Sequence, residues 1–251
     1  MANTPTVSVR VLGCGDSFGS GGRHHTCFFF DTPDSKLLID FGASALIAMH
    51  RAGLDPKLVD AVVLSHLHGD HFGGLPFLIL DAAFISCRSR PLIVAGPPGT
   101  EKRLRETTDA MFPGIWTTPR RCTLQFIELE DGRTTTVAGA AVTPYRVIHD
   151  SGAPAFALRV ASGGRTVAYS GDTAWTDRLI DAARDADLFL CESSSYEKPI
   201  PNHLTYQTVA ANRDRFGARR LVLTHMGDDV LERRSELAIE AADDGQIFVL
   251  D

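Results

Sequence analysis

The chain has 251 residues, of which 44% are hydrophobic and 22% are charged, and its formal net charge at pH 7 is −6. These values are typical of a globular protein, and the even composition predicts a single domain over residues 1–251. The acidic balance argues against a protein whose main role is to hold nucleic acid, because that affinity comes from neutralising phosphates.

The N-terminal residues are polar and contain no basic stretch followed by an apolar core, so we expect no signal peptide. The longest apolar stretch, 77–85, is interrupted by Asp81 and is too short to span a bilayer. Five cysteines are spread along the chain without a Cys-x-x-Cys pair, which favours a reducing compartment. We therefore expect a cytoplasmic protein that makes no contact with a membrane.

Strand and helix patterns alternate along the chain. In the first half the sequence predicts strands over 7–11, 26–30, 36–39, 60–64 and 91–95, and helices over 43–52, 74–85 and 99–111. Several strands are expected between 122 and 169. The last third predicts helices over 175–184, 205–216 and 228–242, and strands over 188–191, 220–223 and 246–250. Two packed sheets with helices outside would satisfy this order.

Three histidines and an aspartate directly follow the apolar strand 60–64. They are His66, His68, Asp70 and His71. Burying four such groups without a shared partner costs about 1–3 kcal/mol for each group. A metal cation removes that cost, because imidazole nitrogens and carboxylate oxygens are standard ligands of zinc and related ions. The cluster therefore predicts a metal site.

Three more candidate ligands each follow an apolar strand and precede a turn or a helix. They are His149, Asp172 and His225. Alone, each has an ordinary structural explanation; Asp172, for example, could cap the following helix. Because rigid strands hold ligands while the loops leave room for substrate, we interpret these residues and the first cluster as one set of seven.

The His-x-His-x-Asp-His string, followed by a histidine, an aspartate and a histidine at strand ends, resembles the metallo-β-lactamase superfamily over essentially the whole chain. The resemblance implies an α/β fold, the αββα sandwich of two packed mixed β-sheets flanked by helices, with a two-metal site at one edge. The ligands implied for one metal are His66, His68 and His149. Those implied for the second are Asp70, His71 and His225, with Asp172 bridging both.

Two divalent metal ions roughly 3.5–4 Å apart can hold a hydroxide between them and stabilise the charge of an in-line displacement. We expect Asp70 also to orient or deprotonate the attacking water. Histidine-rich ligation favours zinc, while manganese and iron also occupy mixed nitrogen and oxygen sites. Redox di-iron members of the superfamily usually carry an acidic residue at the position of His68, so its presence favours hydrolysis.

Two further segments resemble the ribonuclease Z-like branch of metal-dependent phosphodiesterases. One is the glycine-rich stretch 12–22 with the histidines that follow it, and the other joins 192–195 to 202–205. By that resemblance, His203 is a catalytic residue that contacts a phosphoryl oxygen or protonates the leaving oxygen. The alternative is a residue without a role at a helix start, where Asn202 could serve as the cap.

Two other polar groups have open interpretations at this point. Asp40 ends a strand near the expected site and could orient a ligand histidine. A cap for the helix that begins near Ala43 is the alternative. His24 and His25 lie at a polar loop tip, which explains them as well as a substrate contact does.

Bacterial tRNA-processing members carry a long insertion between the residues matching His149 and Asp172, and it projects as a tRNA-binding arm. Here residues 150–171 leave room only for a hairpin that turns at Gly163-Gly164. We therefore expect a smaller phosphodiester, such as a cyclic nucleotide or cyclic phosphate, and not tRNA. The resemblance also suggests a homodimer.

Two alternatives to a phosphodiesterase stay open. A lactone, ester or thioester hydrolase could use the same scaffold, because the ligand set does not separate acyl from phosphoryl chemistry. A non-catalytic metal-binding accessory protein is the alternative of another class, and a catalytic site differs from it by keeping an open coordination position.

Overall fold

The computed structural model describes residues 6–119 and 121–251, and it contains two seven-stranded β-sheets that pack face to face. The first sheet consists, in spatial order, of β14 (Ile247–Leu250), β1 (Val7–Gly13), β2 (Cys27–Asp31), β3 (Lys36–Ile39), β4 (Ala61–Val63), β5 (Leu92–Gly96) and β6 (Leu124–Glu128). The second consists of β13 (Glu240–Ala241), β12 (Leu221–Thr224), β11 (Leu188–Glu192), β10 (Arg165–Tyr169), β9 (Phe156–Ser162), β8 (Ala140–Arg146) and β7 (Thr135–Val137).

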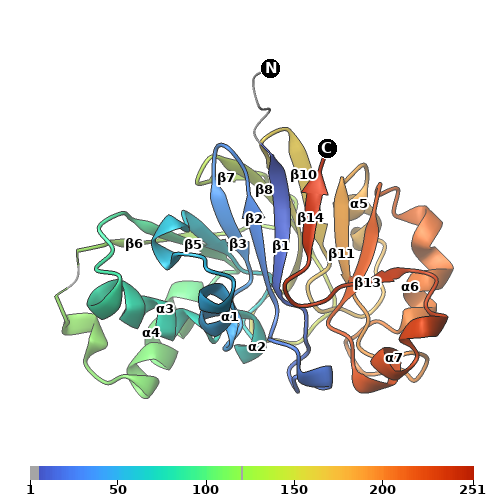
Figure 1. Cartoon of the computed structure of the whole chain (residues 1–251), viewed down its shortest axis with the longest axis horizontal. Coiled ribbons are helices and arrows are strands. Elements are labelled where there is room, and N and C mark those ends of the chain that lie inside the picture. Colours follow the sequence, from blue (N-terminus) through green and yellow to red (C-terminus); the bar gives the residue numbers. More distant parts are fainter. Residues whose placement is uncertain (1–5, 120) are drawn as a thin grey trace.

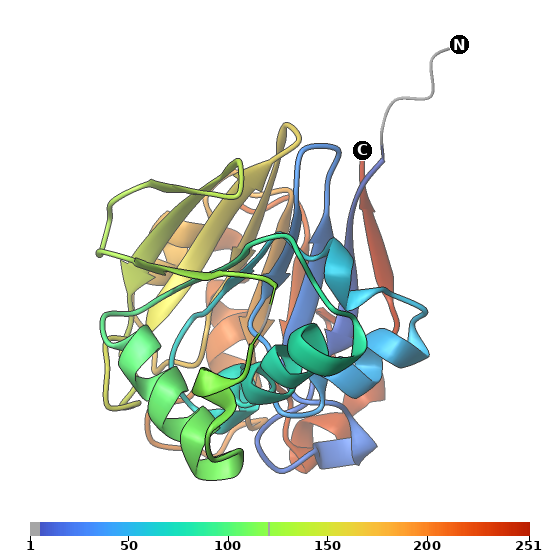
Figure 2. The same ribbon diagram turned by 90° about the vertical axis from the view of Figure 1, so that its left-hand side faces the viewer.

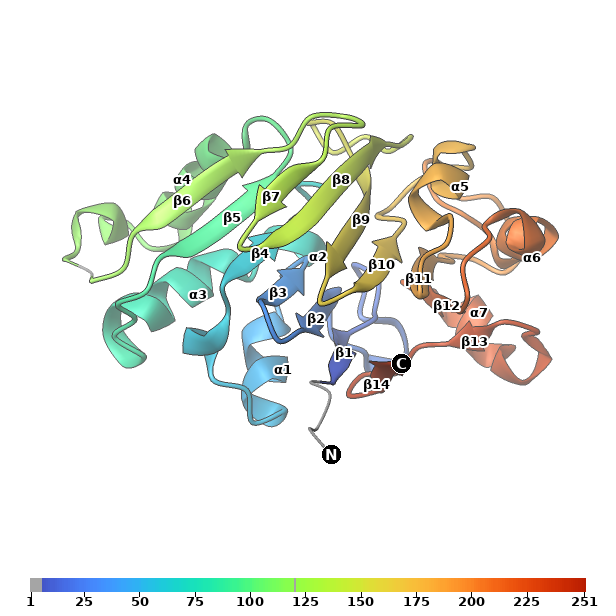
Figure 3. The same cartoon turned by 90° about the horizontal axis from the view of Figure 1, so that it is seen from above.

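Helices flank the outer faces of both sheets (Figures 1 and 3). The first sheet carries α1 (Ala45–Arg51), α3 (Leu75–Leu80) and α4 (Thr100–Met111), which face the viewer in Figure 2. The second carries α5 (Arg178–Ala183), α6 (Tyr206–Asn212) and α7 (Asp228–Glu232), and α2 (Gly69–Phe72) lies at one edge. Single 3₁₀ turns occur at Ser20–Gly22, Pro56–Leu58, Ile115–Thr117, Arg213–Arg215 and Arg234–Glu236, and a π-helical turn at Asp81–Ile85. This is the predicted αββα architecture.

The layer between the two sheets is apolar because alternate residues of each strand face inward. In β1 these are Val7, Val9 and Val11, which are buried against the second sheet. Phe28 and Tyr169 meet there edge to face, with ring centroids 5.3 Å apart. Burying side chains of this size contributes about 1.5–3 kcal/mol each, which holds the sheets together.

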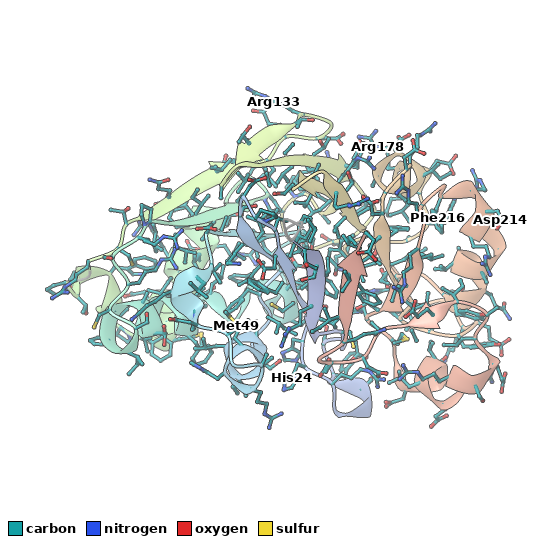
Figure 4. All side chains as sticks on the ribbon, turned by 45° about the horizontal axis from the view of Figure 1, so that its top comes forward. His24, Met49, Arg133, Arg178, Asp214 and Phe216 are labelled. Carbon is teal, nitrogen blue, oxygen red and sulfur yellow. The ribbon has the colours of Figure 1, made fainter. Side chains whose placement is uncertain are left out.

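Two smaller apolar clusters attach the helices to the outer faces of the sheets. Met49 of α1 is buried on the first sheet, and Phe216 is buried on the second (Figure 4). Arg133 and Asp214, by contrast, lie at the periphery of the molecule. Among the described residues, no helix has the length and apolar character needed to cross a membrane.

Because several strands run parallel, the loops that carry the predicted ligands lie at the same edge of the two sheets. β3, β4, β5 and β6 run parallel in the first sheet, and β10, β11 and β12 run parallel in the second. Carboxyl ends of parallel strands meet at one edge, and ligands bind there in open α/β sheets. That edge, with α2, lies opposite the N- and C-termini in Figure 1.

The predicted helix over 228–242 is wrong beyond its first turns. The α-helix ends at Glu232, and residues 240–241 instead form β13, which pairs with Val222 and Leu223 of β12. The buried side chains of Ile239 and Ala242 flank this strand. Backbone hydrogen bonds to a sheet edge therefore outweigh the local helical pattern. The other predicted helices are present but shorter, with the one over 74–85 ending in the π-helical turn.

Candidate metal centre

All seven predicted ligands converge at the carboxyl edge of the two sheets. They come from the loop and helix after β4 (His66, His68, Asp70 and His71), the loop after β8 (His149), the turn after β10 (Asp172) and the end of β12 (His225). Because these strands belong to two different sheets, the site exists only when the sheets are packed together.

Asp172 occupies the middle of this cluster. Its Oδ2 lies 3.3 Å from Nε2 of His71 and 3.4 Å from Nε2 of His225. The same oxygen lies 3.7 Å from Nε2 of His66 and 3.9 Å from Nε2 of His149. One carboxylate oxygen thus faces four imidazole nitrogens, the position that the resemblance implies for a bridging ligand.

The polar side chains of the site form several overlapping groups whose ligand atoms all lie within 4.8 Å of one another, and two of these groups contain the seven expected ligands. One group is His66, His68 and His149, and the other is Asp70, His71, Asp172 and His225. These are the two sets that the resemblance assigned to two metals. His68 presents Nδ1 rather than Nε2, and this atom lies 3.0 Å from Nε2 of His149.

Three polar atoms at the centre are buried and make no hydrogen bond to any described residue. They are Nε2 of His66, Nε2 of His71 and Oδ1 of Asp172. Leaving such atoms unpaired costs about 1–3 kcal/mol each. Divalent cations would pair all three, since nitrogen and carboxylate oxygen are the donors they take. The residues present therefore fit a metal centre.

Asp40 orients ligands of both groups from beneath the site. Its Oδ2 accepts a hydrogen bond from Nδ1 of His71 at 2.7 Å. The Ser65 hydroxyl donates to the same carboxylate at 2.7 Å, which leaves Ser65 Oγ to accept from Nδ1 of His66 at 3.0 Å. The helix-cap alternative is wrong, because Ser44 occupies the N-cap position of α1. Such contacts fix the imidazole tautomer and aim Nε2 at the metal position.

A second network begins at Glu192, the last residue of β11, for which the sequence predicted no separate role. Its Oε2 accepts a hydrogen bond from the Ser194 hydroxyl at 2.6 Å and from Nδ1 of His203 at 3.1 Å. Ser194 Oγ in turn accepts from Nδ1 of His225 at 3.2 Å. In the sequence, the signal for this orienting role is a glutamate that directly follows the apolar run 188–191. The structure buries this glutamate completely.

His149 is oriented by backbone rather than by a carboxylate. Its Nδ1 donates to the carbonyl of Asn202 at 3.0 Å. The predicted capping role of Asn202 is wrong, because Thr205 caps α6 by accepting from the Thr208 amide at 3.1 Å. Four of the five histidines therefore hold Nδ1 in a protein hydrogen bond and direct Nε2 inward.

Backbone geometry at two positions is unusual. His225 has φ of 53°, a left-handed conformation that costs a non-glycine residue about 1–3 kcal/mol, and its amide donates to the Cys14 carbonyl at 2.9 Å. Gly171 has φ of 59°, and a Cβ there would lie 2.5 Å from the Phe156 carbonyl oxygen. Only glycine fits directly before Asp172, so the turn that aims this carboxylate depends on it.

The charges of the metal-free cluster differ between the two groups. Burial and the neighbouring imidazoles lower the pKa of His66 well below its usual range. Burial alone would also lower the pKa of His225, but the carboxylates of Asp172 and Asp70 outweigh it and raise the pKa to about 9. The imidazoles of His71 and His225 in turn hold the pKa of both carboxyls far below normal, against the effect of burial. Protons and cations thus compete for the second group.

His203 stands next to the cluster without being one of its expected ligands. Its ring centroid lies 5.0 Å from that of His149 and 5.7 Å from that of His225, against which it stacks. Burial lowers the pKa of His203, but its hydrogen bond to Glu192 outweighs this, and the net shift is upward. Glu192 therefore favours the protonated form of an imidazole at the edge of the site.

The glycine-rich loop after β1 closes one side of the site. The Ser17 hydroxyl donates to Asp70 Oδ2 at 2.9 Å, a contact that could not be predicted from the sequence. His24 is turned away, because its Nδ1 lies 2.7 Å from Asp244. His25 lies near the site, and its amide donates to Ser44 Oγ at 2.8 Å.

Comparisons with known proteins agree with this architecture. The β-lactamase superfamily domain matches residues 35–226. An uncharacterized protein of Mycobacterium tuberculosis is 32% identical over 229 residues, which cover 88% of this chain and 81% of that protein. A ribonuclease Z of Methanosarcina acetivorans is 27% identical over 280 residues, which cover 89% of this chain and 90% of the relative.

A solved structure shows the same fold. The crystal structure of the metallo-β-lactamase fold protein YhfI from Bacillus subtilis superimposes with a TM-score of 0.79 at 22% identity, covering 97% of this chain and 99% of that chain. The ribonuclease Z alignment spans 280 positions although this chain has only 251 residues, so that relative carries segments that are absent here.

Proposed function

The chain belongs to the β-lactamase superfamily as a metallo-hydrolase, and we propose that it is a dinuclear phosphodiesterase acting on a small substrate. A cyclic nucleotide or a cyclic phosphate is the substrate class. Zinc is the proposed metal, since five of the seven ligands are histidines, with manganese or iron as alternatives.

The position of His203 carries this proposal. Its Nδ1 is engaged by Glu192 at 3.1 Å, which leaves Nε2 as the atom able to give a proton to a substrate. Cleavage of a phosphodiester needs an acid at the departing alkoxide, and a positioned general acid contributes about 10²–10⁴-fold. Glu192 raises the pKa of His203, which favours the protonated form that a general acid needs. A ribonuclease Z among the relatives supports phosphodiester chemistry.

The metal ions would be held by His66, His68 and His149 on one side and by Asp70, His71 and His225 on the other, with Asp172 between them. When bound, they would lower the pKa of water and neutralise charge on the phosphoryl oxygens. Asp70 remains a carboxylate, held by Ser17, and can accept a hydrogen bond from the attacking water. Asp40 and Glu192 keep the imidazoles aligned during the reaction.

The proposal of a small substrate follows from the segment between His149 and Asp172. Here β9 and β10 form an antiparallel hairpin within the second sheet, and it turns at Gly163-Gly164. This segment has no extension that could hold a large RNA away from the site. Together with the net charge of −6, it argues against tRNA as the substrate.

A substrate panel tests the proposal. Metal-free protein is reconstituted with zinc, manganese or iron, and each form is assayed with bis(p-nitrophenyl) phosphate, cyclic nucleotides, lactones and thioesters. Turnover of phosphodiesters supports the proposal. Turnover confined to lactones or thioesters would assign the acyl alternative, and tight metal binding without any turnover would assign an accessory protein.

A further inference from the structure

A groove of about 440 Å³ opens beside His203, and the proposed chemistry makes no use of it. Its lining includes Trp175, Glu197, His203, Gln207 and Ala211. A volume of this size suits a small organic group rather than a water molecule or an ion.

Both walls of the groove are formed by segments that continue directly from residues of the metal centre. Trp175 lies three residues after Asp172, and the intervening Ala174 donates its amide to the Ile148 carbonyl at 2.9 Å, next to His149. The opposite wall starts at His203 and continues into α6. The position of the groove relative to the ligands is therefore set by the same backbone that positions those ligands.

Away from His203, the chemistry of the lining suits an uncharged ring rather than a second anion. The indole of Trp175 is half-buried, and its N–H makes no hydrogen bond to any described residue. The exposed amide of Gln207 donates to Glu197 Oε2 at 3.2 Å, and Glu197 also lies 3.8 Å from Arg233, so the amide oxygen of Gln207 keeps its capacity to accept a hydrogen bond. Arg215 packs 5.3 Å from the Trp175 ring, but its guanidinium is engaged by Asp177 at 3.0 Å. A heteroaromatic ring could stack on the indole and hydrogen-bond to the exposed side chains of Gln207 and Glu197. His203 is the single basic side chain along the described lining, and its place at the leaving oxygen leaves the rest of the groove without a cation for a further phosphate.

We infer that this groove binds the nucleoside portion of the substrate that is attached to the leaving oxygen. The inference rests on the proposed phosphodiesterase function. His203 stands at the junction of the groove and the metal centre, so a group lying in the groove is the one whose oxygen His203 protonates. The groove thereby determines specificity for nucleoside phosphodiesters over simple alkyl ones.

Fluorescence of Trp175 tests the inference without any metal or turnover. The other tryptophan is removed by Trp116→Phe, and metal-free protein is titrated with adenosine, with ribose as the control that lacks the base. In Ala211→Phe a phenyl ring fills the groove from an exposed position of α6, and Ala141→Phe makes the same change at an exposed position of β8. Thermal unfolding verifies that both variants are folded.

We expect saturable quenching by adenosine and none by ribose. Ala211→Phe should weaken adenosine binding roughly tenfold or more, the effect of losing a base–aromatic contact, while Ala141→Phe should leave it unchanged. Absence of saturable quenching, or equal binding by Ala211→Phe, would overturn the inference even if phosphodiesters are hydrolysed. Conversely, adenosine binding by a protein without phosphodiesterase activity would leave the groove assigned and remove the proposed reaction.

Discussion

His203 donates a hydrogen bond from Nδ1 to Glu192 Oε2 over 3.1 Å, and through the same oxygen it is linked to the ligand His225. The candidate acid and a candidate metal ligand therefore share one buried carboxylate. Substitution can distinguish proton donation from ligand orientation. His203 is outside the two groups of expected ligands, whereas Glu192 positions both His203 and the ligand His225.

Replacement of His203 tests the acid role. We expect His203→Ala to lower kcat for a phosphodiester by about 10²–10⁴-fold, because the leaving oxygen loses its proton donor. Metal content, measured by elemental analysis, should stay the same. His50→Ala, which removes an exposed histidine of α1, is the control, and its kcat and metal content should match those of the parent. Loss of metal in His203→Ala would show that His203 is a ligand instead.

The pH profile gives a second test of the same residue. The pKa of His203 is raised by Glu192, so the protonated form persists above the usual range and activity should fall as pH rises through that pKa. In Glu192→Gln the raising partner is lost, and the alkaline limb of kcat should move to lower pH. A limb that stays in place would mean that another group provides the proton.

Asp40 should act through the ligands it orients. We expect Asp40→Asn to weaken metal affinity about 10–100-fold, since His71 loses its carboxylate acceptor and Ser65 loses the partner that positions His66. Competition with a metal-binding dye measures this affinity. Asp34→Asn, at an exposed turn position, removes the same charge without touching the site and should leave affinity unchanged.

Metal stoichiometry should separate the two ligand groups. His68 belongs only to the first group and Asp172 stands between both, so His68→Ala should retain one ion per chain and Asp172→Ala neither. Elemental analysis after gel filtration gives the counts. Addition of zinc to metal-free protein at about 100 Kd should raise the free energy of unfolding by about 2.7 kcal/mol for one site. An equal count in both variants would contradict the two-group arrangement.

The metal-free protein should lose stability as pH rises. His225 has its pKa raised to about 9 in the folded state, so its stabilising contact is complete below about 6.5 and is lost between about 6.5 and 9. The loss is at most on the order of 3 kcal/mol. Urea unfolding at several pH values measures it. Metal-loaded protein should show the opposite trend over this range, because deprotonated imidazole binds cations more tightly.

Local sequence was enough to predict most strands and all seven candidate ligands. The period-2 pattern of β1, the apolar run before His66 and the polar residues that follow strands are properties of a few consecutive residues. The same local reasoning failed at 228–242, where pairing with β12 converts the end of the expected helix into β13. The contacts of Glu192 and Ser17 were equally out of reach, and the choice between the two interpretations of Asp40 could not be made, since the partners of these residues lie far along the chain.

Residue type and side-chain period are local properties, so the order of amino acids alone identifies the residues that can bind a cation and the strand ends at which they stand. Three relationships emerge only in the folded chain: Asp172 lies between His66 and His225, Asp40 serves both ligand groups, and Trp175 and α6 enclose a groove beside His203. These relationships depend on strand order and on the packing of two sheets, which bring together residues separated by more than a hundred positions.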